Sequence, residues 1–246
     1  MLNFRVSGEG KTIVFLHGFL ESMAMWEYLP LHELKAHCIF IDLPGHGKSK
    51  LTDKSNKPSI DFIADEVICV LNHLNVTNFS IIGHSMGAYV GLIVKQKMPK
   101  CKLLLFLNSN FWCDNEQKKN DRLRVVKVVL KQKKRFITEA IPNLFGNPKL
   151  HKDAIAKLVT EANKIAAKTI VYSTLAMRNR KDFSKEIHLN PSQFPLIHGE
   201  LDTIVTCSDI KSKVISKQQL HIISNGGHML HIERTAELMS VLMSII

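Results

Sequence analysis

The stretch that decides the fold is FSIIGHSMGAYV, residues 79–90, in which an apolar run leads to a serine placed between two glycines. Residues 79–82 have the character of a buried strand, and residues 86–97 have that of a helix. Glycine weakens both kinds of element, so it is expected where conformation or close approach requires it. Gly83 and Gly87 therefore predict a tight strand-to-helix turn around Ser85.

A serine at such a turn is suited to nucleophilic catalysis, because it is exposed and aimed at one place. The G-x-S-x-G pattern after a strand and before a helix is the context of a nucleophile elbow. The helix beginning at Met86 also directs backbone N–H groups and its positive dipole end toward the serine. We predict that Ser85 is the nucleophile and that the N–H of Met86 stabilises an oxyanion.

The rest of the chain alternates apolar runs with helical patterns. Further strands are predicted at 2–6, 12–16, 38–41, 103–107, 194–197 and 220–223, and helices at 60–74 and 86–97. Several strands are apolar on both faces, which indicates a doubly wound, mostly parallel α/β sheet. The turn Ser7-Gly8-Glu9-Gly10 predicts a hairpin between the first two strands.

The alternation stops between Asn108 and Pro195, where helical stretches at 115–140 and 152–178 dominate. They predict a helical insertion at 111–190 between core segments 1–110 and 191–246. Its first stretch places an apolar stripe beside a basic one: Leu123, Val126, Leu130 and Ile137 beside Arg124, Lys127, Lys131 and Lys134. Residues 115–186 hold 18 Lys and Arg against 7 Asp and Glu, which equals the whole net charge of +11. The basic stripe is either a solvated face or a surface that steers an anionic substrate.

Three other strand ends carry polar residues, and parallel strands bring such ends to one edge of the sheet. His17-Gly18-Phe19 places a second oxyanion donor, the N–H of Phe19, after an early strand. Asp202 follows a late strand, and His228 follows the last strand and two glycines. We predict that Asp202 orients His228 and that His228 is the base for Ser85.

Alternatives exist for both the acid and the base. Asp114 is the main rival acid, with Glu200 and Asp209 behind it. His17 is interpreted as a structural hydrogen-bonding residue and His231 as a surface or packing residue.

The chain order of Ser85, Asp202 and His228 resembles that of α/β-hydrolases. Residues 42–49, DLPGHGKS, resemble the D-x-P-G-x-G-x-S loop of that superfamily. The resemblance implies a small capped hydrolase acting on an ester, thioester or C–C bond, with a cap that selects the substrate. We expect substrate contacts from Tyr89, Trp112 and Phe145, and no metal or cofactor.

Three functions remain open at this point. The first is a serine hydrolase of a small carboxylic ester. The second is a cofactor-free C–C hydrolase or lyase, because residues 17–20 and 42–49 also resemble the menaquinone-pathway lyase, although Ala88-Tyr89-Val90 stands where that family has an arginine. The third is a ligand-binding receptor without turnover. The serine at position 85 excludes the dehalogenases and epoxide hydrolases of this fold, which use an aspartate there.

Composition restricts the setting. The five cysteines are scattered without C-x-x-C spacing, which argues against disulfides or a zinc site. The apolar run at 13–16 is too short for a signal peptide, and none is long enough to span a bilayer. Nucleic-acid motifs with interleaved aromatics are lacking. We expect a cytoplasmic protein with a small-molecule partner and neither nucleic acid nor membrane.

Overall fold

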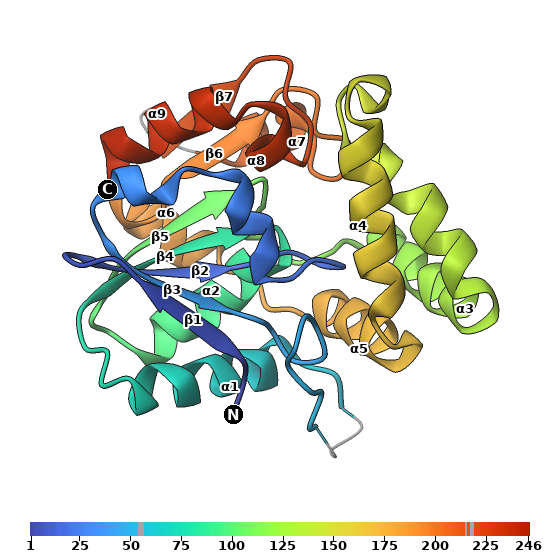
Figure 1. Ribbon diagram of the computed structural model, residues 1–246, viewed down its shortest axis with the longest axis horizontal. Coiled ribbons are helices and arrows are strands. Elements are labelled where there is room, and N and C mark those ends of the chain that lie inside the picture. Colours follow the sequence, from blue (N-terminus) through green and yellow to red (C-terminus); the bar gives the residue numbers. More distant parts are fainter. Residues whose placement is uncertain (54–56, 215, 217–218) are drawn as a thin grey trace.

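The computed structural model describes residues 1–53, 57–214, 216 and 219–246. Its centre is a seven-stranded sheet in the order β1-β3-β2-β4-β5-β6-β7. The strands are β1 (Phe4–Ser7), β2 (Thr12–Leu16), β3 (His37–Ile41), β4 (Phe79–His84), β5 (Cys101–Leu107), β6 (Leu196–Gly199) and β7 (Leu220–Ile223). All neighbours are parallel except β1, which is antiparallel to β3. The predicted α/β fold is confirmed (Figure 1).

Helices cover both faces of this sheet because strand side chains alternate between the faces. In β2, Val14 and Leu16 join the apolar cluster beneath α1 (Ile60–His73) and α2 (Met86–Lys97). Ile13 and Phe15 join the opposite cluster, beneath η1 (Met23–Tyr28) and α9 (Thr235–Ile245). The shorter helices are α6 (Ser184–Leu189), α7 (Cys207–Lys213) and α8 (Leu230–Glu233).

The predicted hairpin between the first two strands is wrong. β1 pairs with β3, with Phe4 opposite Ile41 and Ser7 opposite Cys38. The link between β1 and β2 has four residues, which can span about 13 Å when extended. Two strand spacings amount to only about 10 Å. The link can therefore step over β3, and Gly8 and Gly10 have positive φ where it passes the backbone of Lys35 and Ala36.

A group of three helices lies beside the sheet: α3 (Glu116–Ala140), α4 (Lys152–Lys164) and α5 (Ala167–Arg178) (Figure 1). We call this group, with the short η3 (Pro142–Leu144), the cap. The helical stretch predicted at 152–178 is two helices, because the backbone is extended at Ile165 and Ala166. The cap has its own apolar cluster, which includes Val129, Ile137 and Ile170.

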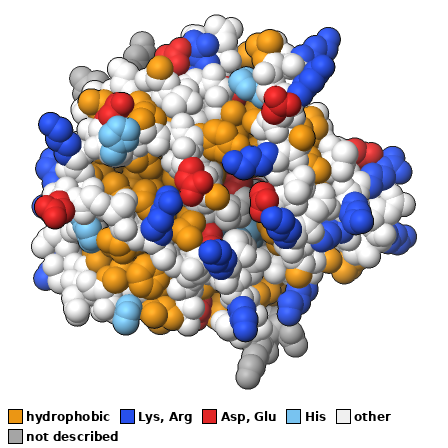
Figure 2. Space-filling view, viewed as in Figure 1, with side chains coloured by type: hydrophobic (Ala, Val, Ile, Leu, Met, Phe, Trp, Pro, Cys, Tyr) orange, Lys and Arg blue, Asp and Glu red, His pale blue; other side chains and the backbone are white. Residues whose placement is uncertain are grey.

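The stripes predicted on α3 are only partly correct. Leu130 is 67% exposed, and Val129 is buried in its place. The helix also contains one non-helical residue, Gln132, two positions after Leu130. Arg124, Lys127, Lys131 and Lys134 are exposed, and Figure 2 shows Lys and Arg side chains over the cap. Among the described residues, no helix is both long and apolar enough to cross a membrane.

Candidate active site

Ser85 occupies a strained turn between β4 and α2. Its φ of 48° and ψ of −113° are rare for a residue with a side chain. A Cβ on Gly83 would lie 2.5 Å from the backbone nitrogen of Ala88, and one on Gly87 would lie 2.2 Å from the carbonyl oxygen of Leu16. The two glycines therefore allow the turn to pack against the start of α2 and the end of β2.

Asp202 and His228 form a buried pair at the ends of β6 and β7. His228 Nδ1 lies 2.7 Å from Asp202 Oδ2, and both residues are almost fully buried. Asp202 Oδ1 accepts hydrogen bonds from the N–H groups of Ile204 and Val205, at 2.8 and 3.1 Å. The carboxylate is thus fixed on both oxygens, and His228 receives a defined acceptor at Nδ1.

Asn108, at the end of β5, is a further part of this pair that the sequence analysis missed. Its Nδ2 donates to Asp202 Oδ2 and to the carbonyl oxygen of Gly227, both at 3.0 Å. Burial alone would raise the pKa of Asp202, but attraction to His228 and hydrogen bonds from His228 and Asn108 hold it below its usual value. Asp202 is therefore ionised at neutral pH. The sequence signal for Asn108 was that a polar residue follows an apolar strand.

The two expected oxyanion donors lie at the ends of β4 and β2. Met86 is the first residue of α2, where a backbone N–H has no acceptor within the helix. Phe19 follows β2, in a loop fixed by the 2.8 Å hydrogen bond from the N–H of Gly18 to Glu21 Oε2. In the described part of the chain, neither the N–H of Phe19 nor that of Met86 has a protein acceptor.

A cavity of about 360 Å³ lies between the sheet and the cap. The core side contributes, among others, Phe19, Ser85, Tyr89, Ile204, His228 and Met229. The cap contributes Arg122, Phe136, Ala140, Asn143, Leu144 and Met177. The lining is mostly apolar, with the serine and the histidine on its floor. Such a cavity is of the size and character that binds small organic molecules.

The residues expected to contact substrate are not all in this cavity. Tyr89 lines it. Trp112 lines a different cavity, together with Asp114 and Lys118. Phe145 is buried in the cap, where its ring stacks on His151 at a centroid distance of 5.4 Å. Aromatic type alone did not distinguish a cavity wall from helix packing.

The rival acid and the other histidines have different partners. Asp114 forms ion pairs with Arg122 and Arg180 instead of with a histidine. His17 accepts the N–H of Leu43 at Nε2 and bonds the carbonyl oxygen of Gly18 through Nδ1. His231 is fully buried, so the packing interpretation fits and the surface interpretation does not.

Arg122, which the sequence analysis placed in no site, brings a positive charge to the cavity. It comes from α3 and its Nε binds Asp114, while Nη1 lies 3.6 Å from Met177 Sδ. A guanidinium has five N–H donors, so Arg122 retains donors for a substrate oxygen.

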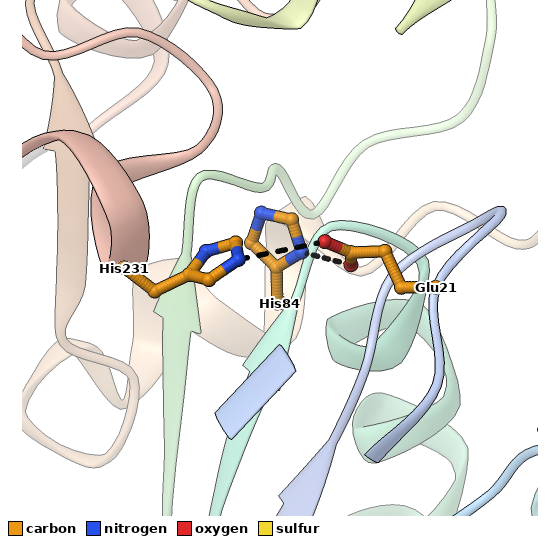
Figure 3. Close-up of side chains that lie close together, drawn as sticks. All are labelled: Glu21, His84 and His231. Atoms are coloured by element: carbon orange, nitrogen blue, oxygen red, sulfur yellow. Dashed lines mark hydrogen bonds and ion pairs between the residues drawn. The ribbon is translucent and has the colours of Figure 1, made fainter. Parts of the chain in front are cut away.

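A second cluster lies beside the serine and consists of Glu21, His84 and His231 (Figure 3). Their potential ligand atoms all lie within 4.8 Å of one another, so a transition metal is a possible occupant by donor type. However, Glu21 Oε2 already accepts from Gly18, and His84 Nδ1 lies 2.7 Å from the same oxygen. His84 Nε2 lies 3.0 Å from the carbonyl oxygen of His228. This geometry fits protons between the groups better than a metal ion.

The cap and the loop of His228 are joined directly. The N–H of His228 donates to the carbonyl oxygen of Leu144 at 2.8 Å. Glu233 accepts from the N–H of Gly146 in the cap at 2.8 Å and from the N–H of Gly227 in the loop at 2.9 Å. The backbone of the histidine loop is thus held from the cap side.

The comparison with protein families decides the relationship. A model of the "Alpha/beta hydrolase family" matches residues 13–241. The chain belongs to the α/β hydrolase family. This family match covers β3 to β7, nearly all of β2, the cap and the residues that line the cavity, and leaves out β1.

Individual relatives are more distant. The chain is 24% identical over 257 residues to "Monoacylglycerol lipase ABHD6" of Bos taurus, covering 92% of this chain and 72% of that protein. It is 33% identical over 99 residues to the "Dihydrolipoyllysine-residue acetyltransferase component of acetoin cleaving system" of Pseudomonas putida, covering 39% of this chain and only 26% of that protein. Among solved structures, a thermophilic esterase from Thermogutta terrifontis superposes with a TM-score of 0.86 at 24% identity, covering 99% of this chain and 93% of the other. That similarity concerns the fold.

Proposed function

We propose that this α/β hydrolase is a serine esterase that cleaves a small carboxylic ester through an acyl-enzyme on Ser85. The observation that carries the proposal is the 2.7 Å contact between His228 Nδ1 and an ionised Asp202. His228 lines the same cavity as Ser85, which is held in an elbow. The names of relatives, a lipase and an esterase, agree with it.

The first half-reaction forms the acyl-enzyme. His228 Nε2 takes the proton from Ser85 Oγ as the oxygen attacks the ester carbonyl. The Nδ1–H group of His228 keeps its own proton and donates a hydrogen bond to Asp202 throughout. The N–H groups of Phe19 and Met86 donate to the oxyanion of the tetrahedral intermediate. The alcohol leaves with the proton held by His228, and the acyl group stays on Ser85.

The second half-reaction releases the acid. His228 removes a proton from a water molecule, whose oxygen attacks the acyl carbonyl. The bond to Ser85 Oγ breaks, and Ser85 recovers its proton from His228. The apolar cavity walls, such as Phe136 and Met177, favour an apolar substituent on one side of the ester.

A second candidate is a C–C hydrolase or lyase in which the same residues act mainly as a base. Arg122 favours it, because its guanidinium in the cavity suits a substrate with a carboxylate or enolate oxygen. An esterase whose substrate carries an anionic group would use Arg122 equally well, so the bond cleaved must be tested directly.

A fluorophosphonate probe tests the proposal. Labelling should occur once, at Ser85, and Ser85→Ala should abolish it. Purified protein should then hydrolyse one or more members of a series of p-nitrophenyl esters of increasing acyl length. Turnover of a β-diketone without ester hydrolysis would favour the second candidate, whereas folded protein that is neither labelled nor active would support a receptor.

A further inference from the structure

A buried pair of side chains, Glu21 and His84, contacts three parts of the active site. Glu21 Oε2 accepts the N–H of Gly18 at 2.8 Å, in the loop that carries Phe19. The same oxygen lies 2.7 Å from His84 Nδ1, on the residue immediately before Ser85. His84 Nε2 in turn lies 3.0 Å from the carbonyl oxygen of His228. The pair therefore links the Phe19 loop, the elbow and the histidine loop. Figure 3 shows how Glu21 and His84 face each other.

The partners of His84 determine its protonation state. A backbone carbonyl only accepts hydrogen bonds, so Nε2 must carry a proton. A carboxylate also only accepts, so Nδ1 must carry one as well. With Glu21 ionised, His84 can keep both contacts only as an imidazolium, and Glu21 is its counter-ion.

The electrostatics of the cluster agree with this assignment. Burial disfavours the charged form of His84, but attraction to Glu21 and a hydrogen bond with it outweigh burial and raise its pKa. Burial likewise disfavours the charged form of Glu21, yet His84 lowers its pKa to about 2.

Other groups face the pair from neighbouring elements. His17 and His231 both have a pKa lowered by burial, that of His231 to about 3, so both are neutral at pH 7. Asp202 adds a negative charge on the far side of His228 and also favours the charged form of His84. His228 is the remaining titratable neighbour, with its ring centroid 5.1 Å from that of His84. At neutral pH His84 therefore carries the positive charge of the cluster, and Glu21 carries the matching negative charge.

We propose that the Glu21–His84 ion pair is a positioning device that holds the Phe19 loop and the His228 loop in register with Ser85, an inference that rests on the proposed esterase function. Glu21 and His84 act through the groups they hold. The oxyanion donor and the base must both meet the same reacting carbonyl. Small displacements of either from the serine reduce the rate strongly, by about 10²-fold for a shift near 1 Å.

The packing around the pair indicates the same role. A Cβ on Gly18 would lie 2.3 Å from Glu21 Oε2 and 2.6 Å from His84 Nδ1. The loop that carries Phe19 thus passes directly over the ion pair, with no space for a side chain between them. Gly18 is required at this position because of the pair.

The test removes the charge and keeps the shape, with Glu21→Gln. The amide is neutral, so burial should make His84 neutral too, and a neutral imidazole has only one N–H. If the amide oxygen takes the place of Oε2, His84 can donate to it or to the carbonyl of His228, but not to both. If the NH₂ group takes that place, it can donate to Nδ1 of His84, but the N–H of Gly18 then loses its acceptor. One of the three contacts is lost in either orientation. We expect kcat for ester hydrolysis to fall by about 10²-fold with little change in KM, because the defect lies in alignment and not in the cavity.

Nuclear magnetic resonance of ¹⁵N-labelled histidines supplies a readout that a purely structural role would not move. Wild-type protein at pH 8 should show two protonated ring nitrogens on His84, and Glu21→Gln should show one. His46→Gln is the matched control, because His46 is a buried histidine outside the pair whose pKa is lowered by burial to about 3. It should leave kcat and the His84 signals unchanged, whatever it does to thermal stability.

Several results would overturn the inference. One is a single protonated ring nitrogen on His84 in the wild type at pH 8. Another is unchanged kcat in folded Glu21→Gln or, where that variant does not fold, in His84→Gln. A third is a stoichiometric metal ion in purified protein that Glu21→Gln removes. Wild-type protein that fluorophosphonate fails to label would instead contradict the proposed function, and the resonance measurement on the ion pair would still stand.

Discussion

Replacing Asp202 by asparagine should separate the role of the carboxylate charge from that of its shape. In the wild type, Oδ1 accepts from two backbone N–H groups, and Oδ2 accepts from Asn108 and His228. In Asp202→Asn the amide oxygen must stay at the Oδ1 position, because otherwise its NH₂ would face both backbone donors. The NH₂ group then takes the place of Oδ2.

That orientation has two consequences. The NH₂ group faces Nδ1 of His228, which must become an acceptor, so the proton moves to Nε2. A histidine in this tautomer cannot take the proton from Ser85, and kcat should fall by about 10⁴-fold, the loss known from the equivalent change in a serine protease. The NH₂ of Asn108 also loses its acceptor on residue 202, which should lower the free energy of unfolding by about 1–3 kcal/mol.

The assay is hydrolysis of the best p-nitrophenyl ester, with thermal unfolding measured on the same preparations. Asp209→Asn is the matched control, since Asp209 is an exposed carboxylate on α7, and it should leave kcat unchanged. A kcat for Asp202→Asn near that of the wild type, in folded protein, would refute the tautomer argument. Loss of kcat in Asp114→Asn instead would assign the role of the acid to Asp114, which follows β5.

Three further predictions concern the elbow, acid stability and the basic cap. Gly87→Ala should lower the free energy of unfolding by about 3 kcal/mol or more, because its Cβ would lie 2.2 Å from the carbonyl oxygen of Leu16. Gly91→Ala is the control in chemical denaturation and should cost less, because its Cβ would meet side chains and no backbone atom: Leu104 Cδ1 at 2.6 Å and Ile81 Cγ2 at 3.3 Å. The folded-state pKa of Glu21 is about 2, below its ordinary 4.5, so between these pH values the unfolded chain binds a proton that the folded chain does not. The stability that ionised Glu21 contributes is therefore present above about pH 4.5 and is lost as the pH falls toward 2. Tm measured against pH should fall less steeply in acid for Glu21→Gln than for the wild type. If exposed lysines on α3 steer anionic substrates, kcat/KM for an anionic ester should fall with added salt, and it should also fall in the double variant Lys127→Glu/Lys131→Glu. The kcat/KM for a neutral ester of matched size should not respond. Equal salt responses for the two esters would show that the basic stripe is only a solvated face.

Much of the fold was predictable because its signals are local. The alternation of apolar strands and helices, and the two glycines around Ser85, are properties of short segments. The failures have a common cause in tertiary packing. The order of β1 and β3 depends on which strand the link at Gly8 and Gly10 crosses. The burial of Val129 in place of Leu130 depends on which side of α3 packs against the other cap helices.

In the candidate site, too, residues with a local sequence signal were predictable and residues placed by tertiary packing were not. Residues at strand ends, such as Asp202 and His228, lie where the sheet edge requires them, and the structure brings these two into contact. Arg122 and Glu21 carry no comparable signal, since a charged residue in a helix or loop is most often solvated. Trp112 and Phe145 show the opposite error, because an aromatic side chain in an insertion packs in a core as readily as it lines a cavity.

The hydrogen bonds between the cap and the histidine loop restrict how this protein can open. The carbonyl oxygen of Leu144 and the carboxylate of Glu233 join residues 144–146 to the backbone of Gly227 and His228. A cap that swung away as one rigid lid would therefore pull His228 out of place. Substrate must pass where the cap is not tied to that loop. Exchanging the cap for that of another hydrolase should therefore preserve turnover only when residues 142–147 are kept as the junction, even if every wall of the cavity is replaced.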